Sequence, residues 1–353
     1  MSYRVRTEQR PCREGLDGTF YILESGDGDH RAEIWPALGF NCLSWQVTLD
    51  SRRTELLWAD PNVLKDARPS RSGNPILFPF PNRIRHGGFR WDGVAYQLPI
   101  TDPQNKNAIH GFAFNHPWRV IDSGADAASA WVRGEFSVSR DAPECRKLWP
   151  ADAALAIRYI LADSSLRLEL QVRNPDRKPL PFGVGFHPYF RMAPDVASVQ
   201  VIGTAAQAME QWELVDCVPT RRRLLLQGKH DLLRHPVLER GLKGEQFDDA
   251  YRLGPPAADG SGYRVTLLDP ARGLKLHVES GPEFRDLVVF TPPHREAVCV
   301  EPYTCITDAI NLQQQGMDAG LRVLPPGESR MGFVRFVCRA TDQHGSDTDA
   351  TMR

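Results

Sequence analysis

The stretch LRLELQV at residues 166–172 is the clearest indicator of the fold class, because its leucines and valine alternate strictly with polar side chains. A period of two places the apolar side chains on one face of a strand and the polar side chains on the other. No helical face can be drawn through the same residues. The stretch is therefore typical of a half-buried strand in an antiparallel sheet.

Nine further runs are rich in β-forming residues. They lie at residues 19–23, 42–49, 129–137, 154–161, 263–268, 274–278, 287–291, 297–300 and 331–337. Turn-forming residues separate these runs, at Asp92-Gly93, Asn174-Pro175-Asp176, Asp259-Gly260 and Pro325-Pro326-Gly327. The best helical candidate is short, at residues 306–313. We therefore predict an all-β protein, a large antiparallel β-sandwich in a single domain over residues 1–340, with a polar tail at 341–353.

The charge balance gives no reason to expect a nucleic-acid partner. The chain has 43 lysines and arginines against 44 aspartates and glutamates, and its formal net charge is −1. Hydrophobic residues make up 41 %, which is enough for a core. No run is long and apolar enough to span a bilayer, so we expect no membrane partner either.

The seven cysteines are dispersed, odd in number and without a CxxC pair. They are Cys12, Cys42, Cys145, Cys217, Cys299, Cys305 and Cys338. This pattern favours free thiols in a reducing compartment, and the N-terminus has no apolar leader segment. We expect a cytoplasmic protein with no disulfide.

In five segments, polar residues interrupt apolar or aromatic surroundings. The segments are residues 73–84, 107–112, 183–190, 246–251 and 298–303. Each signal is weak alone: Arg83 could pair with a structural acid, and His187 could be a hydrogen-bonded core histidine. Together they supply two histidines, several carboxylates, an arginine, an asparagine and flanking aromatic rings. A pyranose requires such a set, for its hydroxyls, its C–H face and proton transfer.

The five segments contain PILFPFPNRI, NAIHGF, GFHPYF, FDDAY and CVEPYTCITDAINL. These resemble the successive motifs of the aldose 1-epimerase, or galactose mutarotase-like, family, in the family's order and over most of the chain. The resemblance implies a β-sandwich with neither a metal nor an organic cofactor, and a small-molecule sugar as the partner. The approach Pro79-Phe80-Pro81-Asn82 resembles the broader epimerase-like branch more than dedicated galactose mutarotases.

The resemblance also implies roles for individual residues. His187 matches the family's general acid and Glu301 its general base. His110 matches the second histidine of the active site, and Arg83 the substrate-binding arginine, with Asn82 beside it. Asp248 matches the sugar-binding aspartate, and the adjacent Asp249 is the alternative.

These matches predict an aldose 1-epimerase, in which Glu301 takes the proton of the anomeric hydroxyl while protonated His187 donates to the ring oxygen. A hexose-6-phosphate 1-epimerase is an alternative, with Arg83 or Arg85 on the phosphate. A non-catalytic sugar-binding module is another. Two further alternatives rank lower. One is a zinc site formed by His110, His187 and Glu301. The other is a polysaccharide lyase with the same β-sandwich architecture.

Overall fold

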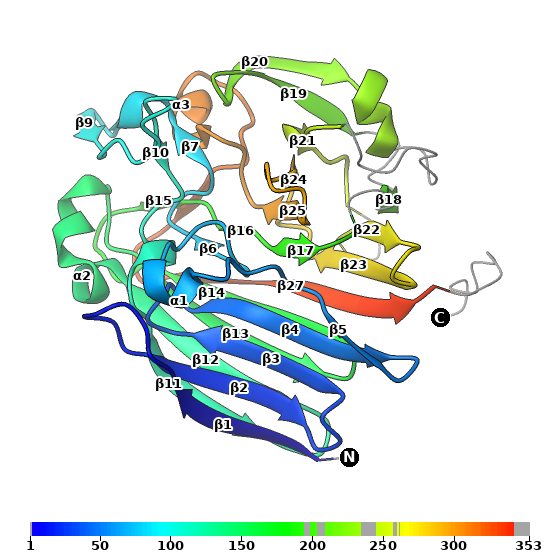
Figure 1. Cartoon of the computed structure of the whole chain (residues 1–353). Coiled ribbons are helices and arrows are strands. Elements are labelled where there is room, and N and C mark those ends of the chain that lie inside the picture. The colour runs from blue at the N-terminus through cyan, green and yellow to red at the C-terminus, as the bar shows by residue number, and fades with distance from the viewer. Residues whose placement is uncertain are drawn as a thin grey trace.

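The computed structural model describes residues 2–193, 198–202, 209–233, 245–256, 260 and 262–341. Strands predominate in it, so the all-β prediction is confirmed (Figure 1). Each of the ten predicted strands is present; for example, residues 166–172 form the centre of β14 (Ser165–Arg173). The predicted helix corresponds to α3 (Ala309–Gln314). From residue 342 on, the predicted polar tail lies outside the described residues, as does Asp259.

The first sheet is an antiparallel meander of five consecutive strands. They are β1 (Tyr3–Gln9), β2 (Thr19–Ser25), β3 (His30–Trp35), β4 (Asn41–Leu49) and β5 (Arg52–Glu55). The sequence did not indicate β1, β3 or β5. Of these, β1 lies at the edge of the sheet, carries the charged residues Arg4, Arg6 and Glu8, and has mostly exposed side chains. Such an edge strand needs little apolar surface, and charges there discourage pairing with another chain.

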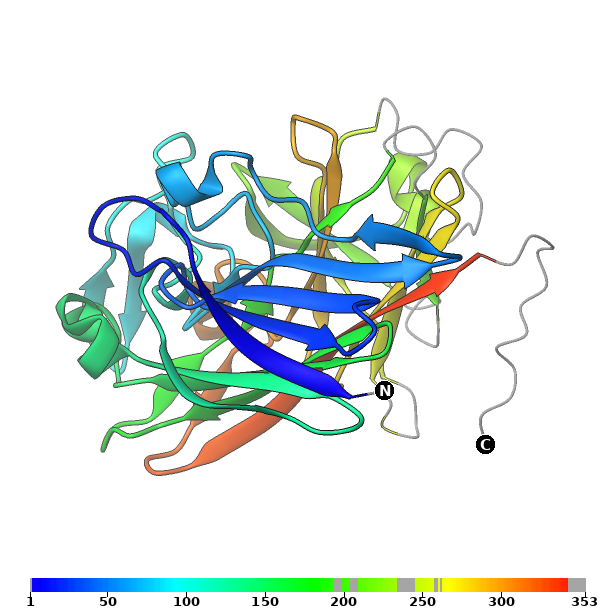
Figure 2. The same cartoon turned by 60° about the horizontal axis from the view of Figure 1, so that its bottom comes forward.

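The second sheet has its strands in an order that differs from the sequence order. From edge to edge it runs β11 (Arg119–Ala125), β12 (Ala130–Ser137), β13 (Ala154–Ala162), β14, β27 (Ser329–Ala340), β23 (Leu274–Ser280), β22 (Tyr263–Asp269) and β18 (Ser198–Ile202). The last strand of the chain, β27, lies in the middle and joins β14 to β23. In both figures the meander of β1–β5 lies against the part of this sheet formed by β11–β14 and β27 (Figures 1 and 2).

The space between the two sheets is filled by apolar side chains. The leucines of β14 are buried, whereas Arg167, Glu169 and Gln171 are partly exposed on the opposite face. Trp45 of β4 packs against Phe336 of β27, with ring centroids 6.2 Å apart. Gly134 leaves room for the ring of Phe40, since a Cβ there would lie 2.8 Å from that ring. Alternation in the sequence therefore becomes a two-layer core.

A third sheet lies beyond the sandwich, in the upper part of Figure 1. Its order is β20 (Val218–Leu225), β19 (Glu210–Val215), β21 (Asp248–Arg252), β24 (Asp286–Phe290), β25 (Ala297–Tyr303), β16 (Gly185–Phe186) and β6 (Ile76–Leu77), and β17 (Tyr189–Arg191) also pairs with β25. Every residue of β25 is buried.

Short elements complete the described structure. Three two-stranded ladders pair β7 (Arg83–Ile84) with β10 (Ala108–Ile109), β8 (Gly88–Trp91) with β9 (Val94–Gln97), and β15 (Leu180–Phe182) with β26 (Arg322–Leu324). The helices besides α3 are α1 (Val63–Asp66), α2 (Val138–Asp141), and the 3₁₀ turns Arg85–Gly87, Ala113–Asn115, Pro143–Leu148 and Gly228–Leu233. Among the described residues, no helix is long and apolar enough to cross a membrane.

Candidate active site

The strand register brings His187 next to Glu301. Gly185 of β16 pairs with Tyr303 of β25, and Tyr189 of β17 pairs with Cys299 of the same strand. His187 lies midway between the two paired residues, where the antiparallel register continues to Glu301. Nε2 of His187 is 3.4 Å from Oε1 of Glu301, and both side chains are buried. Residues more than a hundred positions apart in the sequence thus become neighbours.

Aromatic rings surround His187 on several sides. Its ring stacks on Tyr189 at a centroid distance of 4.7 Å and an angle of 6°. Edge contacts follow with His110 at 5.5 Å and with Phe290 at 6.1 Å. The backbone N–H of His187 donates to the Pro75 carbonyl. These contacts fix the ring, so that its Nε2 stays on the side of Glu301.

A second ladder holds Arg83 and His110. Ile109 of β10 pairs with Arg83 of β7, and the N–H of His110 donates to the carbonyl of Asn82 over 2.8 Å. Asn82 and His110 both have a positive φ, 54° and 68°. Non-glycine residues rarely adopt this conformation, and such backbone strain is often found at functional sites.

The Arg83 guanidinium is bound on two sides. Nε donates to Oδ2 of Asp102 over 2.7 Å, and Nη1 donates to Oδ1 of Asn82 over 3.2 Å. Asp102 also accepts from the Asn105 amide. The guanidinium is therefore oriented before any ligand arrives, which lowers the entropy cost of binding. Asp102 and Asn105 were not predicted from the sequence, although the polar run TDPQNK at residues 101–106, just before NAIHGF, was a signal.

A cavity of about 620 Å³ connects these groups. All six predicted site residues line it: Asn82, Arg83, His110, His187, Asp248 and Glu301. Asp249, the alternative to Asp248, instead forms an ion pair with Lys229 over 2.6 Å. Asp248 accepts a hydrogen bond from the thiol of Cys217, which also lines the cavity and was not predicted. Volumes of this order are typical of small-molecule sites.

Burial shifts the pKa values of the central groups in opposite directions. Burial lowers the pKa of His187. It also lowers the pKa of His110, and the neighbouring His187 lowers the pKa of His110 further. Burial raises the pKa of Glu301 well above its ordinary value, although a hydrogen bond from Tyr303 opposes this rise. In the cavity without a sugar, these directions favour a single proton on Glu301 rather than on His187.

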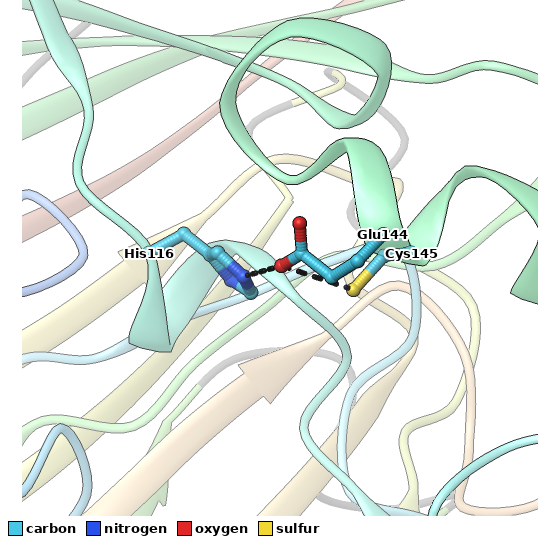
Figure 3. A group of neighbouring side chains, drawn as sticks. All are labelled: His116, Glu144 and Cys145. Atoms are coloured by element: carbon cyan, nitrogen blue, oxygen red, sulfur yellow. Dashed lines mark hydrogen bonds and ion pairs between the residues drawn. The ribbon is translucent and has the colours of Figure 1, made fainter.

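Two groups of three potential metal ligands occur in the described part of the chain. One group consists of His187, Cys299 and Glu301. The zinc site considered from the sequence had His110 as its third ligand, whereas the structure places Cys299 there. The other group lies outside the cavity lining and consists of His116, Glu144 and Cys145 (Figure 3). There Nε2 of His116 is 2.8 Å from Oε1 of Glu144, while Nδ1 contacts the Phe112 carbonyl at 2.7 Å.

Curated relatives match part of the chain. The Escherichia coli protein YihR is 32% identical over 117 residues, which cover 32% of this chain and 34% of YihR. YphB from the same organism is 25% identical over 136 residues, 38% of this chain and 43% of YphB. Each alignment thus spans less than half the length of the relative that it matches.

Solved structures match nearly the whole chain. A galactose mutarotase-like protein from Clostridium acetobutylicum has a TM-score of 0.81 and 22% identity, covering 96% of this chain and 99% of the other. The galactose 1-epimerase from Lactobacillus acidophilus NCFM has a TM-score of 0.70 and 17% identity, with the same coverage. At these identities the likeness shows that the fold is shared, a galactose mutarotase-like β-sandwich.

The family model of aldose 1-epimerase matches residues 28–336. This range contains all five motifs and the complete lining of the cavity described above. It covers well over half of the chain, so this protein belongs to the aldose 1-epimerase family.

Proposed function

We propose that this protein is an aldose 1-epimerase, which interconverts the α and β anomers of a sugar. The observation that carries the proposal is the 3.4 Å approach of His187 to Glu301 in the wall of a cavity that Arg83 and Asp248 also line. Membership of the family supports an isomerase-type enzyme that acts on a carbohydrate. The name of the Lactobacillus acidophilus neighbour, a galactose 1-epimerase, points in the same direction.

In the proposed reaction, Glu301 removes the proton from the anomeric hydroxyl and protonated His187 donates one to the ring oxygen. The C1–O5 bond breaks and the anomeric carbon becomes an aldehyde. Rotation about C1–C2, followed by closure on the other face, returns both protons. Each such transfer contributes about 10²–10⁴-fold to the rate. Arg83, His110 and Asp248 bind the sugar hydroxyls, and Asn82 holds Arg83 and His110 in place.

The reaction needs the single proton of the pair on His187, whereas the pKa directions favour Glu301 in the empty cavity. The reactive arrangement is therefore the less populated one until a sugar binds. Hydroxyl groups of the sugar, which replace the lost solvation of both ions, would favour it. His187 and Glu301 consequently titrate as a pair rather than as independent groups.

A hexose-6-phosphate 1-epimerase is the second candidate, because Arg71 lines the cavity in addition to Arg83. A guanidinium there could pair with a phosphate. Arg85, which was considered for this role, donates to the Pro219 carbonyl and is not among the cavity-lining residues. Of the two arginines in the lining, Arg83 is already paired with Asp102, which leaves Arg71 for a substrate phosphate.

Polarimetry or NMR of anomer exchange, across a panel of free and 6-phosphorylated aldoses, tests the proposal. Exchange of a free aldose above the uncatalysed rate is the expected result. Exchange of phosphorylated sugars alone would favour the second candidate. Sugar binding without exchange would indicate the non-catalytic module, and no response to any sugar would overturn the proposal.

Two broader expectations are also proposals. A single domain over residues 1–340 is supported by one cluster of buried apolar side chains, with members from Tyr3 to Cys338. A cytoplasmic location is supported by the seven cysteines, all of which lie in the described residues as free thiols. Limited proteolysis and cell fractionation test these two expectations.

A further inference from the structure

The phenol of Tyr303 contacts the carboxylate that is proposed as the base. Glu301 and Tyr303 are two residues apart on β25, so their side chains point to the same face of the strand. Oη of Tyr303 donates to Oε2 of Glu301 over 2.5 Å. Both side chains are buried, with 0% of Tyr303 and 1% of Glu301 exposed. The hydrogen bond is therefore shielded from water. In such a buried position a hydrogen bond is stronger than at the protein surface.

The surroundings hold the phenol in this place. Gly185 lies opposite Tyr303 in the ladder, and a Cβ at Gly185 would lie 2.5 Å from the tyrosine ring. A glycine at this position therefore lets the ring approach β16 closely. Asn82, which accepts from Arg83, acts against the rise that burial causes in the pKa of Tyr303. Tyr303 thus connects the sugar-binding segment with Glu301.

The contact makes the two oxygens of Glu301 unequal. Oε2 is occupied by the phenol, whereas Oε1 is turned toward Nε2 of His187 at 3.4 Å. A donor on one oxygen restricts rotation of the carboxylate and stabilises its ionised form. Burial acts in the opposite direction, because it favours the neutral acid.

We infer that Tyr303 is a positioning residue, which aims Oε1 of Glu301 at the sugar and keeps enough of Glu301 ionised to act as the base. This inference rests on the proposed function, since it assigns a role within that reaction. The phenol itself transfers no proton to the substrate. Its effect passes entirely through the carboxylate of Glu301.

The other titratable or charged groups around Glu301 are His187, Tyr189, Arg83, Asp248 and Cys299, and the substitution Tyr303→Phe alters none of these side chains. The pair of Glu301 and His187 shares one proton in two arrangements, and only the carboxylate–imidazolium arrangement reacts. Without the phenol, the proton moves further toward Glu301, so fewer molecules are reactive. Once high pH has removed that proton, both proteins start from the same carboxylate, and the difference between them shrinks.

The test compares Tyr303→Phe with the wild-type enzyme, measuring kcat and KM for the best aldose over a wide pH range. The uncatalysed rate is subtracted at each pH. A hydrogen bond to a charged group corresponds to a loss in kcat of about 10- to 100-fold on the plateau, with an unchanged KM. The alkaline limb should move upward by about one to two pH units, and the loss should shrink along it.

Tyr159→Phe is the matched control, because Tyr159 is a fully buried tyrosine on β13 in the sandwich core. It should leave the whole pH profile unchanged. A uniform loss in Tyr303→Phe at every pH would mean that Tyr303 has only a structural role, and an unchanged rate would mean that it has none. Either result would overturn the inference.

A second measurement does not depend on turnover. The infrared signal of the Glu301 carboxyl is isolated by subtracting the spectrum of a protein that carries Glu301→Gln. This carboxyl should stay protonated to a higher pH in Tyr303→Phe than in wild type. An identical titration in both proteins would overturn the inference, even if no sugar proved to be a substrate. If Tyr303→Phe does not fold, a fluorinated tyrosine at position 303, a stronger donor, should shift the titration downward, and no shift would count against Tyr303.

Discussion

The pair of His187 and Glu301 and the pair of His116 and Glu144 have the same side chains, yet the chemistry of their carboxyl groups differs. His187 and Glu301 are buried in a cavity wall, whereas His116 and Glu144 lie near the surface, with 64% of the Glu144 side chain exposed. Each pair also has a cysteine beside it. Burial raises the pKa of Glu301. The pKa of Glu144 is lowered, first by its own backbone N–H and then by His116.

The difference teaches that residue types alone do not make an acid–base site. Both ring nitrogens of His116 have partners, a backbone carbonyl and a carboxylate. In the described structure, Nδ1 of His187 is buried without a hydrogen-bond partner. A proton in the surface pair is held by water and by fixed partners. A proton in the buried pair is held by few groups, so a bound sugar can shift it from one side chain to the other.

The largest effect expected from this comparison is the loss of activity in Glu301→Gln. The amide keeps the size of the side chain but cannot accept the anomeric proton, so kcat should fall by about 10²–10⁴-fold while sugar binding persists. Glu144→Gln is the matched control and should keep full activity. Anomer exchange followed by NMR measures both variants. Near-normal exchange in a folded Glu301→Gln protein would show that Glu301 is not the base.

Replacement of the acid should have a similar but coupled effect. His187→Asn removes the proton donor, and kcat should fall by orders of magnitude, whereas His116→Asn should change little. The double variant of His187 and Glu301 should lose far less than the product of the two single losses, because each transfer depends on the other. A double-mutant cycle on kcat provides the measurement. Multiplicative losses would mean that the two residues act independently.

The pH dependence of kcat/KM, which reports the pKa values of the enzyme without bound sugar, should show a broad plateau between two limbs. The reactive pair holds one proton, so activity falls where the second is bound and where the last is lost. The lowered pKa of His187 moves the acid limb down, and the raised pKa of Glu301 moves the alkaline limb up. A rate profile from acid to alkaline pH checks this. A narrow optimum between the ordinary pKa values of glutamate and histidine would contradict it.

Stability should respond to pH in opposite ways at the two glutamates. The folded chain holds the proton of Glu301 more tightly than the unfolded chain, since its pKa is raised, so this group costs stability as pH rises above its ordinary value of 4.5. Glu301→Gln should therefore raise Tm by a few degrees at neutral pH. Glu144, with a lowered pKa, contributes stability that is lost as pH falls. Glu144→Gln should slightly lower Tm at neutral pH. Thermal unfolding of the three proteins across pH tests both signs.

The smallest effect is expected from a chelator. Three potential ligands meet at each pair, yet the proposed reaction needs only proton transfer, so dialysis against EDTA should leave kcat unchanged. Activity that disappears with EDTA and returns with zinc would support the metal alternative instead. The variant Glu144→Gln shows which of the two ligand groups binds the metal, because it removes a ligand from the surface group only. A dependence on zinc that persists in this variant would belong to the buried group.

The strands could be predicted from the sequence where one face is buried. Residues 166–172 and 274–278 alternate, and both form interior strands of the second sheet. Edge and short strands were missed, such as β1 with its charged residues and the two-residue β7 and β10. The interior strands β3, β19 and β21 were missed as well. These elements are determined by pairing with a partner strand, β1 with β2 and β7 with β10, rather than by local hydrophobic periodicity.

The sequence by itself determined the fold class and the candidate residues, because a period of two and the motif residues are local properties that can be read along the chain. The tertiary structure decided which of these residues meet. Only the register of β16, β17 and β25 brings His187 to Glu301, and only the packing places Tyr303 on its second oxygen. The physical reason is that proximity and burial, and through them the pKa of Glu301, depend on long-range pairing that no local pattern encodes.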